Sequence, residues 1–400
     1  MPITIHRGTH QIGGCVTEIR SQNTRIIIDM GAELPSAVKQ EKPELEIKGV
    51  TVGKPDCGGV FISHYHGDHI GMFEKIMPEI PVYMGEVAHS VFLNLYKHLR
   101  GKNTERIKAF KTFKPKDKIR VTNEITVTPY FVDHSAYDAY MFLIEAEGKR
   151  ILHTGDFRAH GWKGKGLFPT LEHYIEHVDV LIIEGTMLSR AGEKIYSEVD
   201  LYNDAKKLMR DNRNVFVLCS STNFDSIASF YKAAQECNRL FVCDSYQRSN
   251  LDIVSEAAVS DLYKMEKAKI YWDGREDCID KMKEMGFCML VRANGKFDKV
   301  LEMFPDSLFI YSMWDGYLED GAAKNEKIYN FIPKDEHGKL KYLPLHTSGH
   351  ATTETIIEVC KKLKPQIIIP IHGEKPERFK EFELTGCEIR VLEDHQTVTV

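Results

Sequence analysis

Residues 59–69 read Gly-Val-Phe-Ile-Ser-His-Tyr-His-Gly-Asp-His, an apolar run that passes directly into three histidines and an aspartate. A strand turns alternate side chains to opposite faces, whereas a loop at a strand end can direct several side chains to one point. Imidazole and carboxylate groups are the ligands that zinc and similar divalent ions bind at hydrolytic sites. A lone histidine is usually an ordinary core or surface residue, but a cluster of this kind favours a metal site. The candidate ligands are His64, His66, Asp68 and His69.

Three more polar residues follow apolar, strand-like runs further along the chain. They are His134, Asp156 and His372. Taken singly, each has an ordinary explanation, because an aspartate in a Gly-Asp turn is usually structural and a histidine at a strand end is usually only polar. Their shared placement at strand ends makes them a set, and together with the first cluster they supply enough ligands for a two-metal site.

The ordered series resembles the ligand series of the metallo-β-lactamase superfamily. The resemblance implies an α/β protein with an αββα sandwich and two divalent ions. Zinc is expected because histidines dominate, and manganese is the alternative. It implies one ion held by His64, His66 and His134, a second held by Asp68, His69 and His372, and Asp156 bridging the two. Asp29 resembles the aspartate that orients the ligand loop from behind the ligands.

Three further motifs narrow the resemblance. Glu184 follows the apolar run 181–183, the loop 346–351 reads His-Thr-Ser-Gly-His-Ala, and His372 stands in Pro-Ile-His-Gly-Glu. These resemble the extra motifs of the β-CASP nucleases, and ribonuclease J most of all. The chain ends about 30 residues after His372, so we expect it to lack the additional C-terminal domain of ribonuclease J.

The chemistry of phosphodiester hydrolysis suits these residues. Two metals generate a bridging hydroxide and neutralise the phosphate charge, with Asp68 taking part as ligand and catalytic group. His350 suits protonation of the leaving oxygen, and Glu184 would orient it. Phosphate oxygens would meet donors from His346, Ser348 and Gly349 beside a helix N-terminus. The alternative for this loop is simple helix capping.

The domain organisation follows from a change of pattern near residue 195. Helical and buried strand patterns alternate from there to about residue 312, which is typical of an α/β layer with a parallel sheet. The 400 residues suit two domains. We expect a catalytic domain of residues 1–194 and 344–400, with a β-CASP-like α/β domain of residues 195–343 inserted into it.

The composition indicates the cellular compartment of the protein and the charge of the partners that it could bind. No apolar run is long enough to span a bilayer, no secretory signal is evident, and the nine cysteines are scattered singly, which together favour the cytoplasm. The net charge of −5 does not favour a nucleic-acid partner, but residues 97–120 hold ten Lys or Arg against Glu105 and Asp117. This basic run is either a solvated face or a surface for phosphates.

The sequence therefore predicts a metal-dependent ribonuclease that hydrolyses single-stranded RNA. His372 favours RNA over DNA, because the resemblance associates histidine at this motif with RNA processing. One alternative is a metallohydrolase acting on a small ester, a thioester or a cyclic nucleotide. Another is a nucleic-acid-binding subunit without catalysis. The sequence is compatible with a homodimer and does not distinguish endonuclease from 5′-exonuclease.

Overall fold

The computed structural model describes residues 1–34, 45–99, 101–190, 195–271, 276–321 and 323–400. It divides into two compact units. The first contains Met1–Leu34, Gln40–Lys194 and Gly349–Val400, and the second contains Ile195–Ser348.

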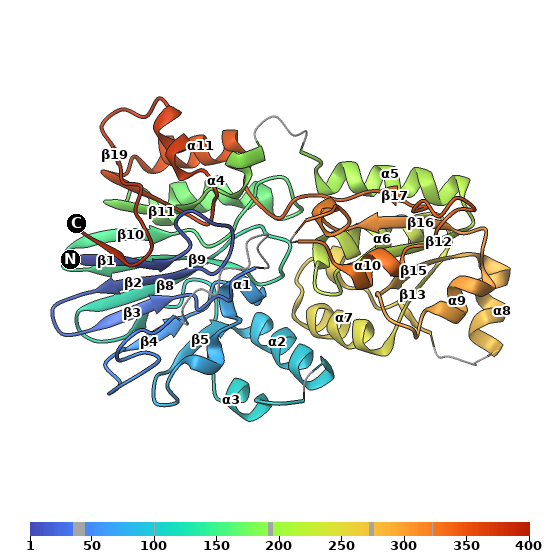
Figure 1. Cartoon of the computed structure of the whole chain (residues 1–400), viewed down its shortest axis with the longest axis horizontal. Coiled ribbons are helices and arrows are strands. Elements are labelled where there is room, and N and C mark those ends of the chain that lie inside the picture. The colour runs from blue at the N-terminus through green and yellow to red at the C-terminus, as the bar shows by residue number, and fades with distance from the viewer. Residues whose placement is uncertain (35–44, 100, 191–194, 272–275, 322) are drawn as a thin grey trace. The chain divides into compact units, whose positions relative to one another are not determined.

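The first unit is built on two seven-stranded sheets (Figure 1). One has the order β20-β1-β2-β3-β4-β5-β6 and the other β19-β18-β11-β10-β9-β8-β7. The strands of the first sheet are β1 (Pro2–Arg7), β2 (Val16–Arg20), β3 (Arg25–Ile28), β4 (Gly59–Phe61), β5 (Val82–Gly85), β6 (Lys111–Phe113) and β20 (Gln396–Thr399). Those of the second are β7 (Ile119–Arg120), β8 (Ile125–Phe131), β9 (Tyr140–Ala146), β10 (Lys149–His153), β11 (Val180–Glu184), β18 (Ile367–Ile371) and β19 (Glu388–Ile389). The helices of this unit are α1 (Gly67–Ile70), α2 (Glu86–Leu99), α3 (Thr104–Lys108), α4 (Leu167–Thr170) and α11 (Thr353–Leu363).

The central strands β9, β11 and β18 of the second sheet are buried on both faces, because they are apolar at most positions. Phe142 and Ile144 of β9 pack in the core between the two sheets, whereas Met141 and Leu143 pack in the core under α11. This division follows from the two-residue period of a strand. Helix α2 lies against β5 and β6 of the first sheet, and its Phe92 meets Phe73 edge to face. Helices thus flank two packed sheets, and the predicted αββα sandwich is confirmed.

Parallel pairing brings the ends of the central strands to common sheet edges. In the second sheet β10, β11 and β18 are parallel, with Leu152 opposite Leu181 and Glu184 opposite Ile371. In the first sheet β3 and β4 are parallel, with Ile28 opposite Phe61. The polar residues that follow these strands therefore emerge side by side.

The pairing of the chain's two ends was not predicted. Strand β20 lies antiparallel to β1, with Pro2 opposite Thr399, and β19 continues the other sheet beyond β18. Neither strand has a clear apolar alternation, since Gln396–Thr399 is mostly exposed. Pairing with β1, not its own pattern, makes this segment a strand.

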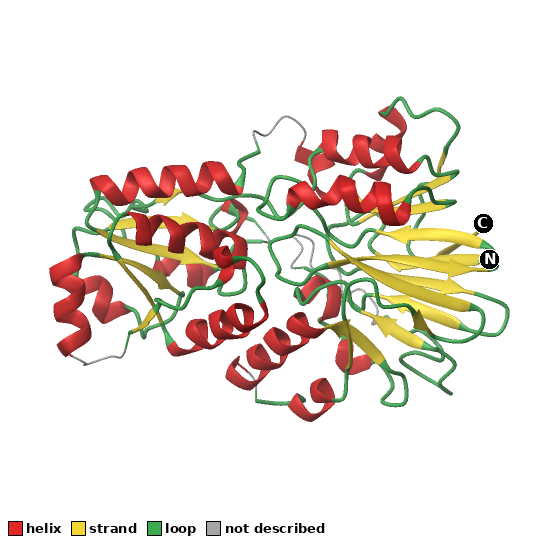
Figure 2. Cartoon of the chain, turned by 180° about the vertical axis from the view of Figure 1, so that it is seen from behind, coloured by secondary structure: helices red, strands yellow, loops and turns green. Residues whose placement is uncertain are grey.

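The second unit contains a parallel sheet, as the alternating pattern predicted. Its order is β14-β13-β15-β12-β16-β17 and every strand pair is parallel. Helices accompany the strands in the secondary-structure view (Figure 2). The strands are β12 (Asn214–Cys219), β13 (Leu240–Cys243), β14 (Lys269–Ile270), β15 (Phe287–Val291), β16 (Leu308–Ser312) and β17 (Leu343–Pro344). The helices are α5 (Glu198–Asp211), α6 (Phe224–Glu236), α7 (Ser245–Ala257), α8 (Glu276–Met285), α9 (Asp298–Met303) and α10 (Glu326–Phe331).

One helix of this unit begins earlier than its sequence pattern predicts. The apolar periodicity indicates a helix near residues 250–260, but α7 starts at Ser245. The side chain of Asp244 accepts a hydrogen bond from the backbone of Gln247, and the Gln247 side chain accepts one from the backbone of Asp244. This capping box fixes the start of the helix. None of the helices in the described ranges is both long and apolar enough to cross a membrane.

Candidate metal centre

The predicted metal ligands converge from the segments that follow β4, β8, β10 and β18, with Asp68 and His69 in the short helix α1. Three histidines form one group whose nitrogen atoms lie within 4.8 Å of one another: His64, His66 and His134. A second group, within the same distance, contains Asp68, His69, Asp156 and His372. Asp156 links the two, because its Oδ2 lies 3.1 Å from His69 Nε2 and 3.8 Å from His64 Nε2.

The spacing within each group suits a divalent ion. His66 Nδ1 lies 3.1 Å from His64 Nε2 and 3.2 Å from His134 Nε2. In the other group, His372 Nε2 lies 3.2 Å from His69 Nε2 and 3.3 Å from Asp68 Oδ2. A tetrahedral zinc ion with bonds of 2.0–2.1 Å separates its ligand atoms by about 3.3 Å. The donors present therefore fit metal ions in both geometry and chemistry.

Four of the histidines are held through the nitrogen that faces away from the cluster. Thr186 Oγ1 donates its proton to the His372 carbonyl, and Ser63 Oγ donates its proton to Asp29 Oδ2. Each hydroxyl oxygen therefore accepts a hydrogen bond from the imidazole beside it. The donors are His64 Nδ1 to Ser63 Oγ, His69 Nδ1 to Asp29 Oδ2, His134 Nδ1 to the Gly349 carbonyl, and His372 Nδ1 to Thr186 Oγ1. With the proton on Nδ1, each ring directs the lone pair of Nε2 into the cluster.

Asp29 anchors the ligand loop from behind. It adopts a left-handed backbone with φ 61°, directly after β3, and is fully buried. Its Oδ1 accepts from the Ser63 backbone N–H at 2.7 Å, and its Oδ2 accepts from both Ser63 Oγ and His69 Nδ1 at 2.8 Å. One carboxylate thus ties Ser63, just after β4, to His69, six residues further along the chain.

The electrostatics of the cluster favour a cation. Burial, together with the neighbouring histidines, lowers the pKa of His64 and of His134 well below the usual value, so these rings are neutral. Burial opposes ionisation of Asp156, but His372 and His69 hold its pKa well below the usual value. Burial would lower the pKa of His69 and of His372, but the carboxylate of Asp156 raises both well above the usual value, so a metal ion would displace a proton from each ring. Neutral imidazoles and ionised carboxylates are the forms that coordinate metal.

A second pair of residues lies beside this cluster without belonging to the predicted ligands. His350 Nδ1 donates to Glu184 Oε2 at 3.0 Å and lies 3.7 Å from Asp156 Oδ2. Glu184 is fully buried at the end of β11, and its Oε1 accepts from the Phe157 backbone N–H at 3.0 Å. Burial alone would lower the pKa of His350, but Glu184 and Asp156 raise it overall.

The residues of this site lie in two regions of the chain that match known protein families. Residues 24–212 match the description "Beta-lactamase superfamily domain", and residues 341–381 match "Zn-dependent metallo-hydrolase RNA specificity domain". The chain belongs to the metallo-β-lactamase superfamily. Curated relatives that it matches are named ribonuclease J, which supports its resemblance to the β-CASP branch of this superfamily.

Three of these relatives show the extent of the similarity. Ribonuclease J of Helicobacter pylori is 26% identical, with 93% of this chain and 56% of the relative covered. Ribonuclease J of Mycoplasma genitalium is 23% identical, with 92% and 67% covered. An RNase J-like protein of Methanocaldococcus jannaschii is 23% identical, with 93% and 92% covered. The chain thus spans about half the length of the Helicobacter relative.

A solved structure shows the same fold along the whole chain. A crystal structure of a protein of unknown function from Enterococcus faecalis superposes with a TM-score of 0.80 at 22% identity. It covers 100% of this chain and 99% of that protein. The metallo-β-lactamase fold and the second α/β unit therefore occur together in both proteins.

Sequence reasoning missed several residues that complete this metallo-β-lactamase site. Thr186 holds His372, and the Gly349 carbonyl holds His134, a role that was not predicted for this residue. No residue other than glycine fits at position 31, because a Cβ there would lie 1.7 Å from the Asp68 carbonyl oxygen. The need for glycine at position 31 could have been predicted from the sequence, since Gly31 closely follows Asp29 in Ile-Asp-Met-Gly. Hydrogen bonds between distant loops leave no pattern in the sequence.

The predicted phosphate-binding residues divide between the two units. Gly349 belongs to the first unit, whereas His346 and Ser348 belong to the second. Binding of phosphate by His346, Ser348 and Gly349 remains a prediction.

The basic run follows the end of α2, α3 and the strands β6 and β7. Most of its cations are exposed, but Arg106 donates to the carbonyls of Glu74 and Ile76 and is half-buried. Lys108 pairs with Glu105 at 2.6 Å and Lys114 with Glu86 at 3.4 Å. Arg100 lies outside the described residues. The run is therefore a cationic surface with partial internal pairing.

Proposed function

We propose that this protein is a metal-dependent ribonuclease that hydrolyses phosphodiester bonds in single-stranded RNA. The Glu184–His350 pair carries the proposal, because binding of two ions needs neither residue and yet a buried carboxylate holds this histidine against the cluster. The match of residues 341–381 to an RNA specificity domain, which includes His350 and His372, supports RNA as the substrate.

The ligands divide between two ions. His64, His66 and His134 would hold one, Asp68, His69 and His372 the other, and Asp156 would bridge them. When bound, two divalent ions activate water for attack and neutralise the charge of the phosphodiester. Zinc fits the histidine-rich donors best, and manganese is the alternative.

The protein's own residues would manage the protons. Attack of water on phosphorus breaks the bond to the leaving ribose oxygen, which then needs a proton. His350 is bound to Glu184 through Nδ1, so its Nε2 is the nitrogen that would give this proton. Asp68 would receive the proton from the attacking water. Its side chain is 14% exposed whereas that of Asp156 is 3% exposed, so Asp68 is the carboxylate that can pass the proton on to solvent.

Cleavage of a 5′-labelled single-stranded RNA, beside the same sequence as DNA, tests the proposal. The proteins are wild type, His350→Ala and His337→Ala, each loaded with Zn²⁺ or Mn²⁺. His337 is a matched control, because it is an 82% exposed histidine of the second unit. We expect RNA-selective cutting by wild type and His337→Ala, and a loss of about 100-fold or more in His350→Ala.

The label also separates the remaining possibilities. Release as a mononucleotide indicates a 5′-exonuclease, and release as a longer fragment indicates an endonuclease. Absence of cutting by a metal-loaded wild type would overturn the proposal. Turnover of a small ester, a thioester or a cyclic nucleotide that survives His350→Ala would then identify a small-molecule hydrolase, and tight RNA binding without cutting would identify a binding subunit.

A further inference from the structure

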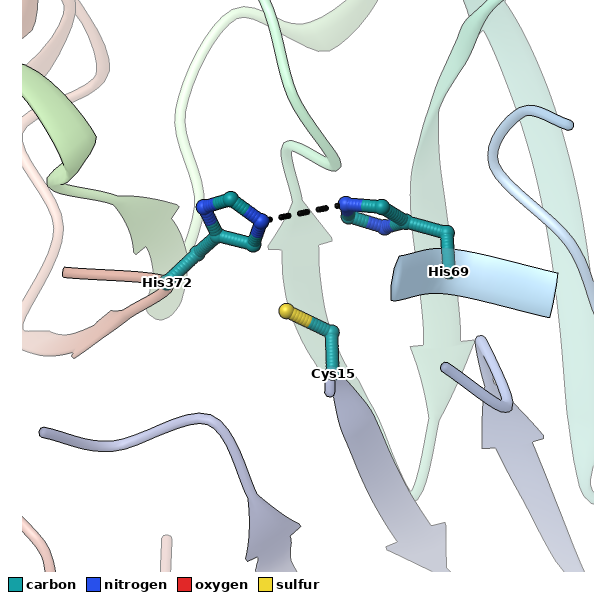
Figure 3. A group of neighbouring side chains, drawn as sticks. All are labelled: Cys15, His69 and His372. Carbon is teal, nitrogen blue, oxygen red and sulfur yellow. Dashed lines mark hydrogen bonds between the residues drawn. The ribbon is translucent and has the colours of Figure 1, made fainter. Parts of the chain in front are cut away.

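A buried thiol faces the two histidines of the second group. Cys15 lies just before β2, is 1% exposed, and forms a group with His69 and His372 whose ligand atoms lie within 4.8 Å of one another. Asp68 and Asp156 group with the same two histidines without Cys15, so the sulfur must move closer to these carboxylates to share one ion with them. The Cys15 sulfur points toward the space between the two rings (Figure 3). The outer nitrogens of both rings are engaged by Asp29 and Thr186, so the thiol meets the side of each ring that faces the cluster.

The backbone fixes the thiol in this place. The Cys15 N–H donates to the Asp68 carbonyl at 3.1 Å, and its own carbonyl accepts from Gly31 at 3.0 Å. Gly8 adopts φ 103°, and a Cβ there would lie 3.3 Å from the Cys15 sulfur. The Gly8 carbonyl in turn accepts from the His372 backbone N–H at 2.7 Å. The sulfur is thus tied on one side to the ligand loop and on the other to the strand end that carries His372.

The other cysteines provide a contrast. Cys57 is also buried in the first unit, but its sulfur donates to the carbonyls of Arg25 and Gly59. All nine cysteines are described, and among the described residues Cys15 alone joins a group of metal-ligating side chains. Ordinary packing of a small apolar residue accounts for a buried cysteine, but not for one aimed between two imidazoles whose lone pairs converge.

We propose that Cys15 is a ligand of the metal ion that His69 and His372 hold, and that its thiolate makes this a zinc position. The inference rests on the metal binding of the proposed function and decides between its two candidate metals. As the sulfur–metal bond forms, the thiol proton is released to solvent. Thiolate ligands favour zinc over manganese, which prefers oxygen donors. The ion of the three-histidine group has no such sulfur among the described residues.

Cobalt(II) reports sulfur ligation directly, without any assay of cleavage. The full chain is stripped of metal and titrated with Co²⁺ as wild type, Cys15→Ser and Cys57→Ser. We expect a sulfur-to-cobalt charge-transfer band in the near ultraviolet for wild type and Cys57→Ser, and no such band for Cys15→Ser. We also expect Cys15→Ser to bind one of two Zn²⁺ ions about 10-fold or more weakly, since even residues behind the ligands have effects of this size.

The outcomes separate this inference from the proposed function. Two bound Co²⁺ ions with no band that depends on Cys15 would overturn the inference and leave the metallohydrolase intact. Failure of wild type to bind Co²⁺ or Zn²⁺ would overturn both. If Cys15→Ser does not fold, X-ray absorption of wild type with stoichiometric Zn²⁺ decides: a sulfur shell at about 2.3 Å supports the ligand, and nitrogen and oxygen shells alone contradict it.

Discussion

Glu184 accepts a hydrogen bond from His350 at 3.0 Å, although 166 positions of sequence separate the two residues. The same carboxylate accepts from the backbone N–H groups of Phe157 and Ala351, at 3.0 and 3.4 Å. Glu184 therefore joins three parts of the first unit: the end of β11, the loop that carries Asp156, and the start of the segment that leads into α11. A buried carboxylate with several donors is a rigid support for the ring that it holds.

Glu184→Gln should lower kcat for RNA cleavage by about 100-fold while two metal ions still bind, because glutamine retains the shape but loses the charge that holds His350. Steady-state kinetics and metal analysis measure the two effects. Glu172→Gln is the control, since Glu172 is an exposed carboxylate paired with Lys362. A change confined to KM, or loss of metal together with activity, would show that Glu184 does not position His350.

Asp29→Asn should weaken metal binding by about 10-fold, since it replaces the carboxylate that orients His69 and supports Ser63. Asparagine tolerates the left-handed backbone of this position, so the variant should remain folded. Competitive Zn²⁺ titration with a chromophoric chelator measures the affinity. Unchanged affinity in a folded variant would contradict the orienting role.

Lys108→Glu combined with Lys111→Glu should weaken RNA binding if the basic run contacts phosphates. Loss of two contacts to a single strand reduces the slope of log K against log salt by about 1.4. Both lysines are exposed. The control is Lys54→Glu with Lys361→Glu, which changes the net charge equally at exposed sites of the same unit. Equal effects of the two double variants would identify the run as a solvated face.

Glu18 should make the stability of the first unit depend on acidic pH. Burial would raise its pKa, but the hydrogen bond from His6 and the charge of Arg25 lower it to about 2 from a usual value of 4.5. Because the folded pKa is the lower one, the stabilisation is complete above pH 4.5 and is lost as the pH falls toward 2.

Glu18→Gln should therefore destabilise the protein by up to about 3 kcal/mol at pH 7. The difference from wild type should shrink between pH 4.5 and pH 3, as measured by urea unfolding. Glu145→Gln, at a 44% exposed carboxylate, serves as the control. A difference that stays constant over this pH range would rule out Glu18 as its source.

The fold and much of the site were predictable because both depend on local patterns. Buried strands such as β12 carry unbroken apolar runs, and the candidate ligands follow such runs directly. The position of Cys15 was not predictable, since its neighbours His69 and His372 approach it only through the tertiary structure. The pairing of β20 with β1 was missed for the same reason, because the partner strand supplies what the sequence of residues 396–399 lacks.

The order of the ligands along the chain bears on how the protein is made. His64, His66 and His134 leave the ribosome before the second unit, whereas His372 follows all of it, on the loop after β18. The three histidines of the first group are synthesised early, but the Gly349 carbonyl that holds His134 follows the second unit, as His372 does. A chain interrupted within the second unit therefore lacks His372 and the group that it forms with His69.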